Sequence, residues 1–227
     1  MGTSASDDRW LAEYKKLKGY SLFRSFDPWK FRALRFTSLV PGRQAAICDF
    51  GAGEGRALLA LQRLGYSNLH ALDTRNVLRP ELKDRVGFTE GDLANLEGIA
   101  AESFDAAYVF EALHHLPDRQ ACLQALAGIR RTLKPGGLLF LYEPVLNLPT
   151  RLQYALVRRK ALHFIPLLKT MAALLRMEER ELFAFYGYMD GIGDMLGSLG
   201  YARIMERNFL NHRLWAACKE AAGRGGA

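Results

Sequence analysis

Glycines and carboxylates lie close together between residues 45 and 74, AAICDFGAGEGRALLALQRLGYSNLHALDT. Gly51, Gly53 and Gly55 follow directly on an apolar run. Glycine has no Cβ, so such a turn can adopt positive φ angles and can let a ligand lie against bare main chain. Asp73 ends the next apolar run, where its carboxylate can accept two hydrogen bonds from a ribose diol. Residues of these types at this spacing are suited to binding a nucleoside.

The elements that must position these residues are a strand, a helix and a second strand. We predict a buried strand over 45–50, a helix over 56–64 and a second strand over 69–72. The first turn of such a helix has unpaired N–H groups and a partial positive charge, which suit a carboxylate or phosphate. The alternative is a plain corner in which the glycines serve only the turn. Arg56 stands where a dinucleotide-binding turn has its third glycine, which disfavours a nicotinamide oxidoreductase.

Strands and helices continue to alternate after this unit. Strands are expected over 86–90, 104–110 and 138–142, with helices over 79–83 and 113–133. This alternation predicts an α/β fold with a doubly wound, mostly parallel sheet.

The last third of the chain has a different pattern. Residues 150–176 are amphipathic and basic, and a further helix is expected over 178–199. Strands over 201–209 and 212–219 would form an antiparallel hairpin at the sheet edge. The expected organisation is an N-terminal helical lid (1–40), a main domain (41–219) with a helical insertion (150–176), and a flexible tail (220–227).

Charge is unevenly distributed along the 227 residues, whose formal net charge is +7. Residues 1–40 contain eight Lys/Arg against four Asp/Glu, and residues 151–176 contain six Lys/Arg and no acid. The basic excess therefore lies outside the nucleotide-binding segment. It indicates an acidic substrate, a membrane surface or nucleic acid as a partner, or else only a solvated helical face.

Other features of the composition narrow the class of protein. No apolar run is long enough to cross a membrane, and the first residues lack the pattern of a secretory signal. The three cysteines are widely spaced and show no metal-ligand spacing, so no metal site is predicted. A cytoplasmic location is expected.

Taken together, these segments resemble the class I methyltransferases that use S-adenosylmethionine, in particular the branch that acts on small molecules. ICDFGAGEG is similar to the first motif of that family, HALD to the second, GDL to the third and FDAAYVFEALHHLPD to the fourth. LKPGGLLFLYEP is similar to the family's turn into the fifth strand. The resemblance implies a Rossmann-like sheet of seven strands with an antiparallel terminal hairpin and a helical cap.

The resemblance also implies a cofactor, S-adenosyl-L-methionine, with S-adenosyl-L-homocysteine as the product. Gly51 and Gly53 would lie under its methionine part, and Asp73 would bind its ribose hydroxyls. Asp92 would accept a hydrogen bond from the adenine amino group. The complete set of implied cofactor-binding residues is Asp49, Gly51, Ala52, Gly53, Asp73, Thr74, Asp92, Leu93 and Phe110.

Methyl transfer from a sulfonium is an in-line displacement, for which the protein mainly aligns the reactants and excludes water. An acceptor hydroxyl also needs a base. The candidates are His114, His115 and Glu143, since the strand ends carry the site in an open α/β sheet. One histidine, with a preference for His115, could instead hydrogen-bond main chain beneath a helix start. Glu143, which precedes Pro144, could simply end its strand.

The predicted function is methyl transfer to a small-molecule acceptor, with oxygen favoured over nitrogen or carbon. The acceptor is expected to be partly apolar and, given the basic insertion, anionic. The alternatives are an RNA or protein methyltransferase and a non-catalytic subunit that binds the cofactor. No RNA-binding module is visible, so no nucleic-acid partner is expected. A transient membrane-surface contact through 151–176 is a further hypothesis, and the protein is expected to be a monomer or homodimer.

Overall fold

The computed structural model describes residues 12–16, 31–32, 34–96 and 98–220. Its centre is a seven-stranded sheet in the order β3-β2-β1-β4-β5-β7-β6. The strands are β1 (Ile47–Phe50), β2 (Leu69–Asp73), β3 (Gly87–Glu90), β4 (Phe104–Phe110), β5 (Leu133–Pro144), β6 (Tyr201–Phe209) and β7 (His212–Lys219). Strands β1 to β5 pair in parallel, whereas β7 is antiparallel to both β5 and β6. The prediction of a doubly wound, mostly parallel sheet with a terminal hairpin is confirmed.

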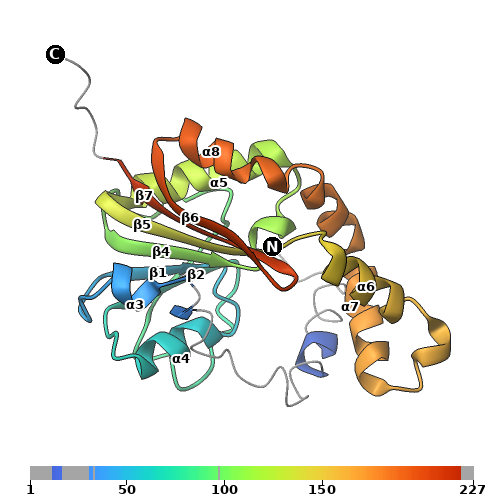
Figure 1. The fold of residues 1–227 in the computed structure, drawn as a ribbon. Coiled ribbons are helices and arrows are strands. Elements are labelled where there is room, and N and C mark those ends of the chain that lie inside the picture. Colours follow the sequence, from blue (N-terminus) through green and yellow to red (C-terminus); the bar gives the residue numbers. More distant parts are fainter. Residues whose placement is uncertain (1–11, 17–30, 33, 97, 221–227) are drawn as a thin grey trace.

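Helices cover both faces of the sheet (Figure 1). From residue 34 onward, the α-helices of the described residues are α3 (Phe36–Leu39), α4 (Arg56–Arg63), α5 (Arg119–Thr132), α6 (Leu148–Val157), α7 (Pro166–Tyr186) and α8 (Ile192–Ser198). Short 3-10 helices occur at η2 (Leu113–His115), η3 (Lys160–Leu162) and η4 (Met189–Gly191). Helices α5 and α8 lie on one face of the sheet, and α3 and α4 lie on the other.

Two apolar cores result from this layering. Successive side chains of a strand point to opposite faces. In β4, Val109 accordingly belongs to the core under α5 and α8, and Tyr108 to the core under α3 and α4. Because both faces of β4 are covered, the strand is an almost continuous apolar run rather than an alternating one.

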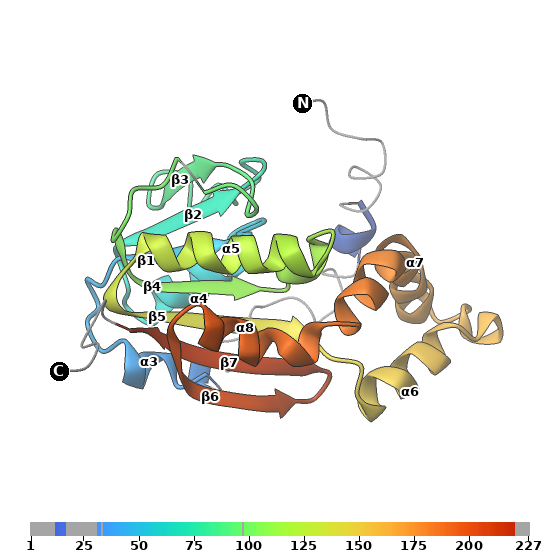
Figure 2. The ribbon, with the colours of Figure 1, turned by 90° about the horizontal axis from the view of Figure 1, so that it is seen from above.

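Helices α6 and α7 lie beyond the carboxyl ends of the parallel strands instead of on a face of the sheet (Figure 2). We call residues 148–186 the cap. The cap has a small core of its own, whose buried members are Val157, Ala172, Leu175 and Leu182. It therefore forms a wall that faces the strand ends.

Three of the helices predicted from the sequence differ in the structure. Residues 80–85 form turns, so the helix expected over 79–83 is absent. The helix expected over 113–133 is divided, because the Asp118 side chain accepts a hydrogen bond from the N–H of Ala121 at 2.8 Å and caps a helix that begins at Arg119. Helix α7 begins with Pro166 at its first turn and runs through residues 176–178, so no new helix starts at Glu178.

Most of the expected N-terminal lid (1–40) and most of the expected tail (220–227) lie outside the described residues. Of the lid, residues 12–16 are helical. Tyr14 in this segment lines the cavity described below.

Candidate active site

A cavity of about 1240 Å³ lies at the carboxyl ends of β1, β2 and β4. The strand order reverses between β1 and β4, and ligands bind at such a switch point in open α/β sheets. The sheet end and the glycine turn form one wall, and the cap forms the opposite wall. The cavity is lined by all nine residues expected to bind the cofactor: Asp49, Gly51, Ala52, Gly53, Asp73, Thr74, Asp92, Leu93 and Phe110.

The three glycines of the turn have different roles. All three have positive φ angles, of 82°, 51° and 75° in chain order. A Cβ on Gly51 would lie 2.6 Å from the Ala112 Cβ, and one on Gly55 would lie 2.4 Å from Leu82 Cδ1. A Cβ on Gly53 would meet nothing within 4 Å, so its main chain borders open space. Gly53 therefore allows close approach of a ligand, whereas Gly51 and Gly55 allow close packing of the protein itself.

This distribution explains why Arg56 is tolerated where a dinucleotide-binding turn has glycine. The close packing is supplied one residue earlier, by Gly55. Arg56 begins helix α4 and hydrogen-bonds the Glu54 carboxylate at 3.1 and 3.2 Å. It lines the cavity and is not buried against the neighbouring strand.

Carboxylates surround the glycine turn. Asp73 at the end of β2 accepts a hydrogen bond from the N–H of Gly53 at 2.8 Å, which ties the strand end to the turn. Asp92 is exposed and accepts from the N–H of Ala94 at 2.8 Å. Asp49 is buried, and burial raises its pKa well above the ordinary value; the Tyr108 hydroxyl offsets part of this rise and the Asp73 charge adds to it. The main chain at Gly53 is open, and the carboxylates of Asp73 and Asp92 can accept hydrogen bonds from a sugar and a base. This arrangement fits an adenosyl sulfonium compound.

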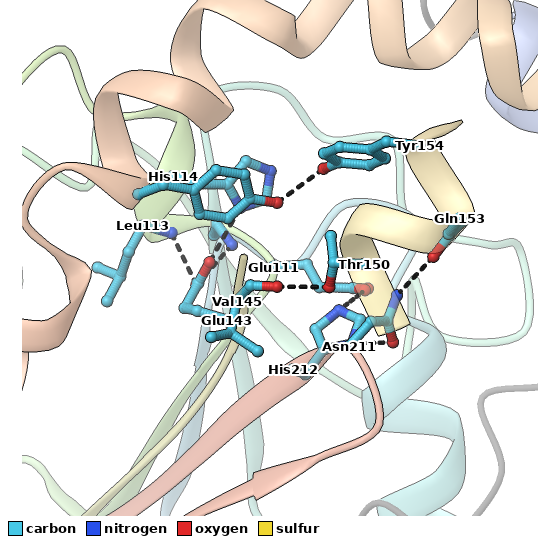
Figure 3. Close-up of polar contacts among 12 residues, drawn as sticks. Glu111, Leu113, His114, Glu143, Val145, Thr150, Gln153, Tyr154, Asn211 and His212 are labelled. Carbon is cyan, nitrogen blue, oxygen red and sulfur yellow. Dashed lines mark hydrogen bonds and ion pairs between the residues drawn. The ribbon is translucent and has the colours of Figure 1, made fainter. Parts of the chain in front are cut away.

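Glu143 does not have the position expected for it. Its side chain is fully buried and does not line the cavity. The carboxylate accepts from the N–H groups of Ala112 and Leu113 at 2.9 and 2.8 Å, and its other oxygen lies 2.9 Å from Nδ1 of His114 (Figure 3). Glu143 therefore holds the segment after β4 in place and orients His114, which lines the cavity.

The two histidines differ in burial and in partner. His114 is the buried one: burial lowers its pKa, but the hydrogen bond and charge of Glu143, together with the charges of Glu178 and Glu111, raise the pKa overall. His115 is more exposed, and its Nδ1 lies 3.0 Å from the Glu181 carboxylate of α7. The Nδ1 of His115 thus contacts a cap carboxylate, and a main-chain hydrogen bond of this histidine stays a prediction.

Sequence reasoning missed a third carboxylate–histidine pair. Glu111, directly after β4, has the left-handed φ of 57°, and its N–H donates to the carbonyl of Tyr142 at 2.8 Å. Glu111 Oε1 lies 2.9 Å from Nε2 of His212, which stacks on the Tyr142 ring at 4.1 Å. The other ring nitrogen of His212 lies 2.9 Å from the Asn211 side chain, which in turn donates to Gln153 of α6 at 3.2 Å (Figure 3).

Only part of this pair could have been found in the sequence. Glu111 stands at a carboxyl strand end, the position at which α/β sheets place functional groups. His212 carries no such signal, because it is 101 residues away and opens an antiparallel strand.

The cap side of the cavity is apolar with a few polar groups. Met171, Leu174, Leu175 and Leu182 line it, together with Tyr186. The Tyr186 hydroxyl hydrogen-bonds that of Tyr154 at 2.7 Å. Tyr188, two residues further on, is not part of the lining and packs against Phe185.

The basic side chains of the cap do not face this space. The cavity lining does not include Arg158, Arg159, Lys160 or Lys169. Arg158, at the end of α6, instead pairs with Glu179 of α7. The cations on which the expectation of an anionic acceptor rested thus lie elsewhere on the cap, and Glu178 and Glu181 line the cavity instead.

The fold, the glycine turn and the carboxylate at the end of β2 define a class I methyltransferase architecture. Residues 48–141 match the family model described as a methyltransferase domain. The resemblance seen in the sequence is confirmed: residues 48–141 carry a methyltransferase domain, and the chain has the fold of the class I methyltransferases.

Particular relatives agree with this assignment. A ubiquinone biosynthesis O-methyltransferase of Xanthomonas campestris is 38% identical over 113 residues, which cover 45% of this chain and 43% of that protein. A sterol 24-C-methyltransferase of Aspergillus fumigatus is 30% identical over 106 residues, or 43% of this chain and 27% of that protein. This chain therefore spans less than half the length of these relatives.

A solved structure extends the likeness in fold beyond the matched residues. A putative S-adenosylmethionine-dependent methyltransferase from Methanococcus maripaludis superimposes with a TM-score of 0.66 and 16% identity. The superposition covers 99% of this chain and 98% of that one. The cap and the terminal hairpin thus belong to a fold that occurs elsewhere as a whole.

Proposed function

We propose that this protein transfers a methyl group from S-adenosylmethionine to a small-molecule acceptor. The observation that carries the proposal is the convergence of the nine expected cofactor residues on one cavity whose opposite wall is the cap. The cofactor, when bound, supplies a methyl group already activated on a sulfonium. The protein supplies bare main chain at Gly53, acceptors at Asp73 and Asp92, and walls that exclude water.

The lining favours a compact, partly apolar acceptor with a polar end. Its cap side carries leucines and methionines beside the paired hydroxyls of Tyr154 and Tyr186. A nucleic acid would need cations along this surface to neutralise phosphates. Among the described residues, the cap side of the lining has Glu178 and Glu181 and no Lys or Arg, and the two arginines of the lining, Arg56 and Arg75, lie on the cofactor side. This distribution argues for a small molecule and against an RNA substrate.

We assign an oxygen of the acceptor as the methylated atom, because groups that can manage its proton surround the cavity. The Glu111 side chain is 41% exposed and lines the cavity, so its carboxylate can take the proton. His212 is a positioning residue that holds this carboxylate. His114 has a raised pKa and is suited to donate a hydrogen bond to the acceptor.

Calorimetric titration with S-adenosylhomocysteine tests the cofactor part of the proposal. The wild-type chain is expected to bind, and Asp73→Ala to bind at least roughly tenfold more weakly, because two ribose hydrogen bonds are lost. Absence of binding by a folded wild-type chain would refute the proposal.

Assays with methyl-labelled S-adenosylmethionine and fractionated metabolites then test turnover. Glu111→Gln should retain S-adenosylhomocysteine affinity and lose about 10²-fold or more in kcat. His212→Asn should lower kcat less and move the acid limb of the pH–rate profile. Equal kcat for wild type and Glu111→Gln would exclude Glu111 as the base.

A further inference from the structure

The outer surface of the cap carries an unusual concentration of exposed apolar side chains. Among the described residues, eight large apolar side chains are strongly exposed, and six of them belong to the cap. Leu148, Leu152 and Leu156 are 68%, 62% and 46% exposed and recur every four residues along α6. Phe164, in the turn after α6, is 78% exposed. A large exposed apolar patch of this kind usually marks a site of interaction with a protein or a membrane.

Helix α6 is amphipathic, so its orientation is defined. Its other side faces the protein: Thr150 and Val157 are buried, and Gln153 and Tyr154 line the cavity. The turn that follows is closed by a hydrogen bond from His163 Nε2 to the carbonyl of Val157 at 2.8 Å. The leucines of α6 are therefore held outward by packing on the opposite side of the helix.

Charge indicates what this surface meets. Residues 148–165 contain four Lys/Arg and no acid. Arg158 is paired with Glu179, but Arg151, Arg159 and Lys160 are exposed among the leucines. Helices that lie in a lipid headgroup layer combine leucine or phenylalanine on one face with lysine and arginine, and the absence of acid from this segment leaves nothing to repel an anionic surface.

We propose that the outer surface of α6 and the turn over 158–165 dock on an anionic lipid bilayer. The leucines and Phe164 enter the headgroup–acyl boundary, and Arg151, Arg159 and Lys160 contact lipid phosphates. No helix among the described residues is both long and apolar enough to span a bilayer. The opposite side of α6 borders the cavity, which places the acceptor side of the cavity next to the bilayer surface.

Sedimentation with large unilamellar vesicles tests the proposal. The full chain should sediment with vesicles of phosphatidylcholine and phosphatidylglycerol in a two-to-one ratio, and much less with phosphatidylcholine alone. Leu152→Glu/Leu156→Glu should abolish binding, and Arg159→Glu/Lys160→Glu should weaken it by roughly tenfold or more. Ile204→Glu is the matched control, because Ile204 is 42% exposed but lies on β6 outside the cap, and it should bind as wild type does.

Two results would overturn the proposal. One is equal sedimentation of the wild type and the Leu152→Glu/Leu156→Glu variant. The other is absence of wild-type vesicle binding. If analytical ultracentrifugation then shows a dimer that this variant makes monomeric, a second copy is the occupant. Circular dichroism of each variant reports folding, and S-adenosylhomocysteine titration keeps a failure of the proposed function separate from a failure of bilayer docking.

Discussion

Replacing Glu143 by glutamine should destabilise the protein even though Glu143 does not line the cavity. The carboxylate is fully buried and accepts from two main-chain N–H groups while pairing with His114. An amide oxygen can still accept from both N–H groups, but hydrogen bonds to a neutral acceptor are about half as strong as those to a charged one. With roughly 1 kcal/mol lost at each of three contacts, we expect about 3 kcal/mol and a fall in Tm of roughly 6–12 °C.

The loss should depend on pH through His114. Its folded-state pKa is raised above the ordinary 6.5, because the Glu143 hydrogen bond and charge outweigh the opposing effect of burial. A raised pKa stabilises the folded state fully below the unfolded value, and that contribution disappears as pH rises through the folded value. Glutamine removes the cause of the rise, so the gap in stability between wild type and Glu143→Gln should be wider at pH 6 than at pH 9.

Urea unfolding followed by circular dichroism at both pH values measures this gap. Glu81→Gln is the control, since Glu81 is an exposed carboxylate in a turn and its midpoint should equal that of the wild type. A gap of the same size at pH 6 and pH 9 would refute the assigned role of His114. A Glu143→Gln midpoint equal to that of Glu81→Gln would refute the role of the buried carboxylate.

The remaining predictions concern the glycine turn and Asp49. Gly55→Ala should cost roughly 2 kcal/mol by thermal unfolding, because its Cβ would overlap Leu82 at a positive φ. Gly53→Ala has open space around its Cβ, so it should cost only about 1 kcal/mol of stability. In calorimetry, Gly53→Ala should weaken S-adenosylhomocysteine binding more than Gly55→Ala does; the reverse order would contradict the roles assigned to the two glycines. The Tm of Asp49→Asn should increase relative to that of the wild type as pH rises. Burial raises the Asp49 pKa, so ionisation of this carboxyl at higher pH destabilises the folded wild type. A difference in Tm between the two proteins that is the same at pH 5 and pH 8 would argue against this.

The sequence alone determined the sheet and the cofactor side of the cavity. Apolar runs of four to seven residues, a glycine turn and a terminal carboxylate are local patterns, and local patterns carry the geometry of a βαβ unit. For this reason the nine expected cofactor residues all line one cavity in the structure. The sequence also showed the uneven charge of the insertion, but it did not show in which direction the charged side chains point.

Only the tertiary structure decided the acceptor side. Three assignments depended on contacts between distant segments: Glu143 beneath Leu113 and His114, His212 against Glu111, and the basic side chains of the cap outside the cavity lining. The Glu143 contacts join residues 29 to 31 positions apart, and the Glu111–His212 contact joins residues 101 positions apart. Spacing along the chain predicts which residues share a helix face or a strand end, whereas such pairs arise only when separate elements pack together. The carboxylates and histidines were visible as residue types, and packing then determined which of them became buried supports and which faced the cavity.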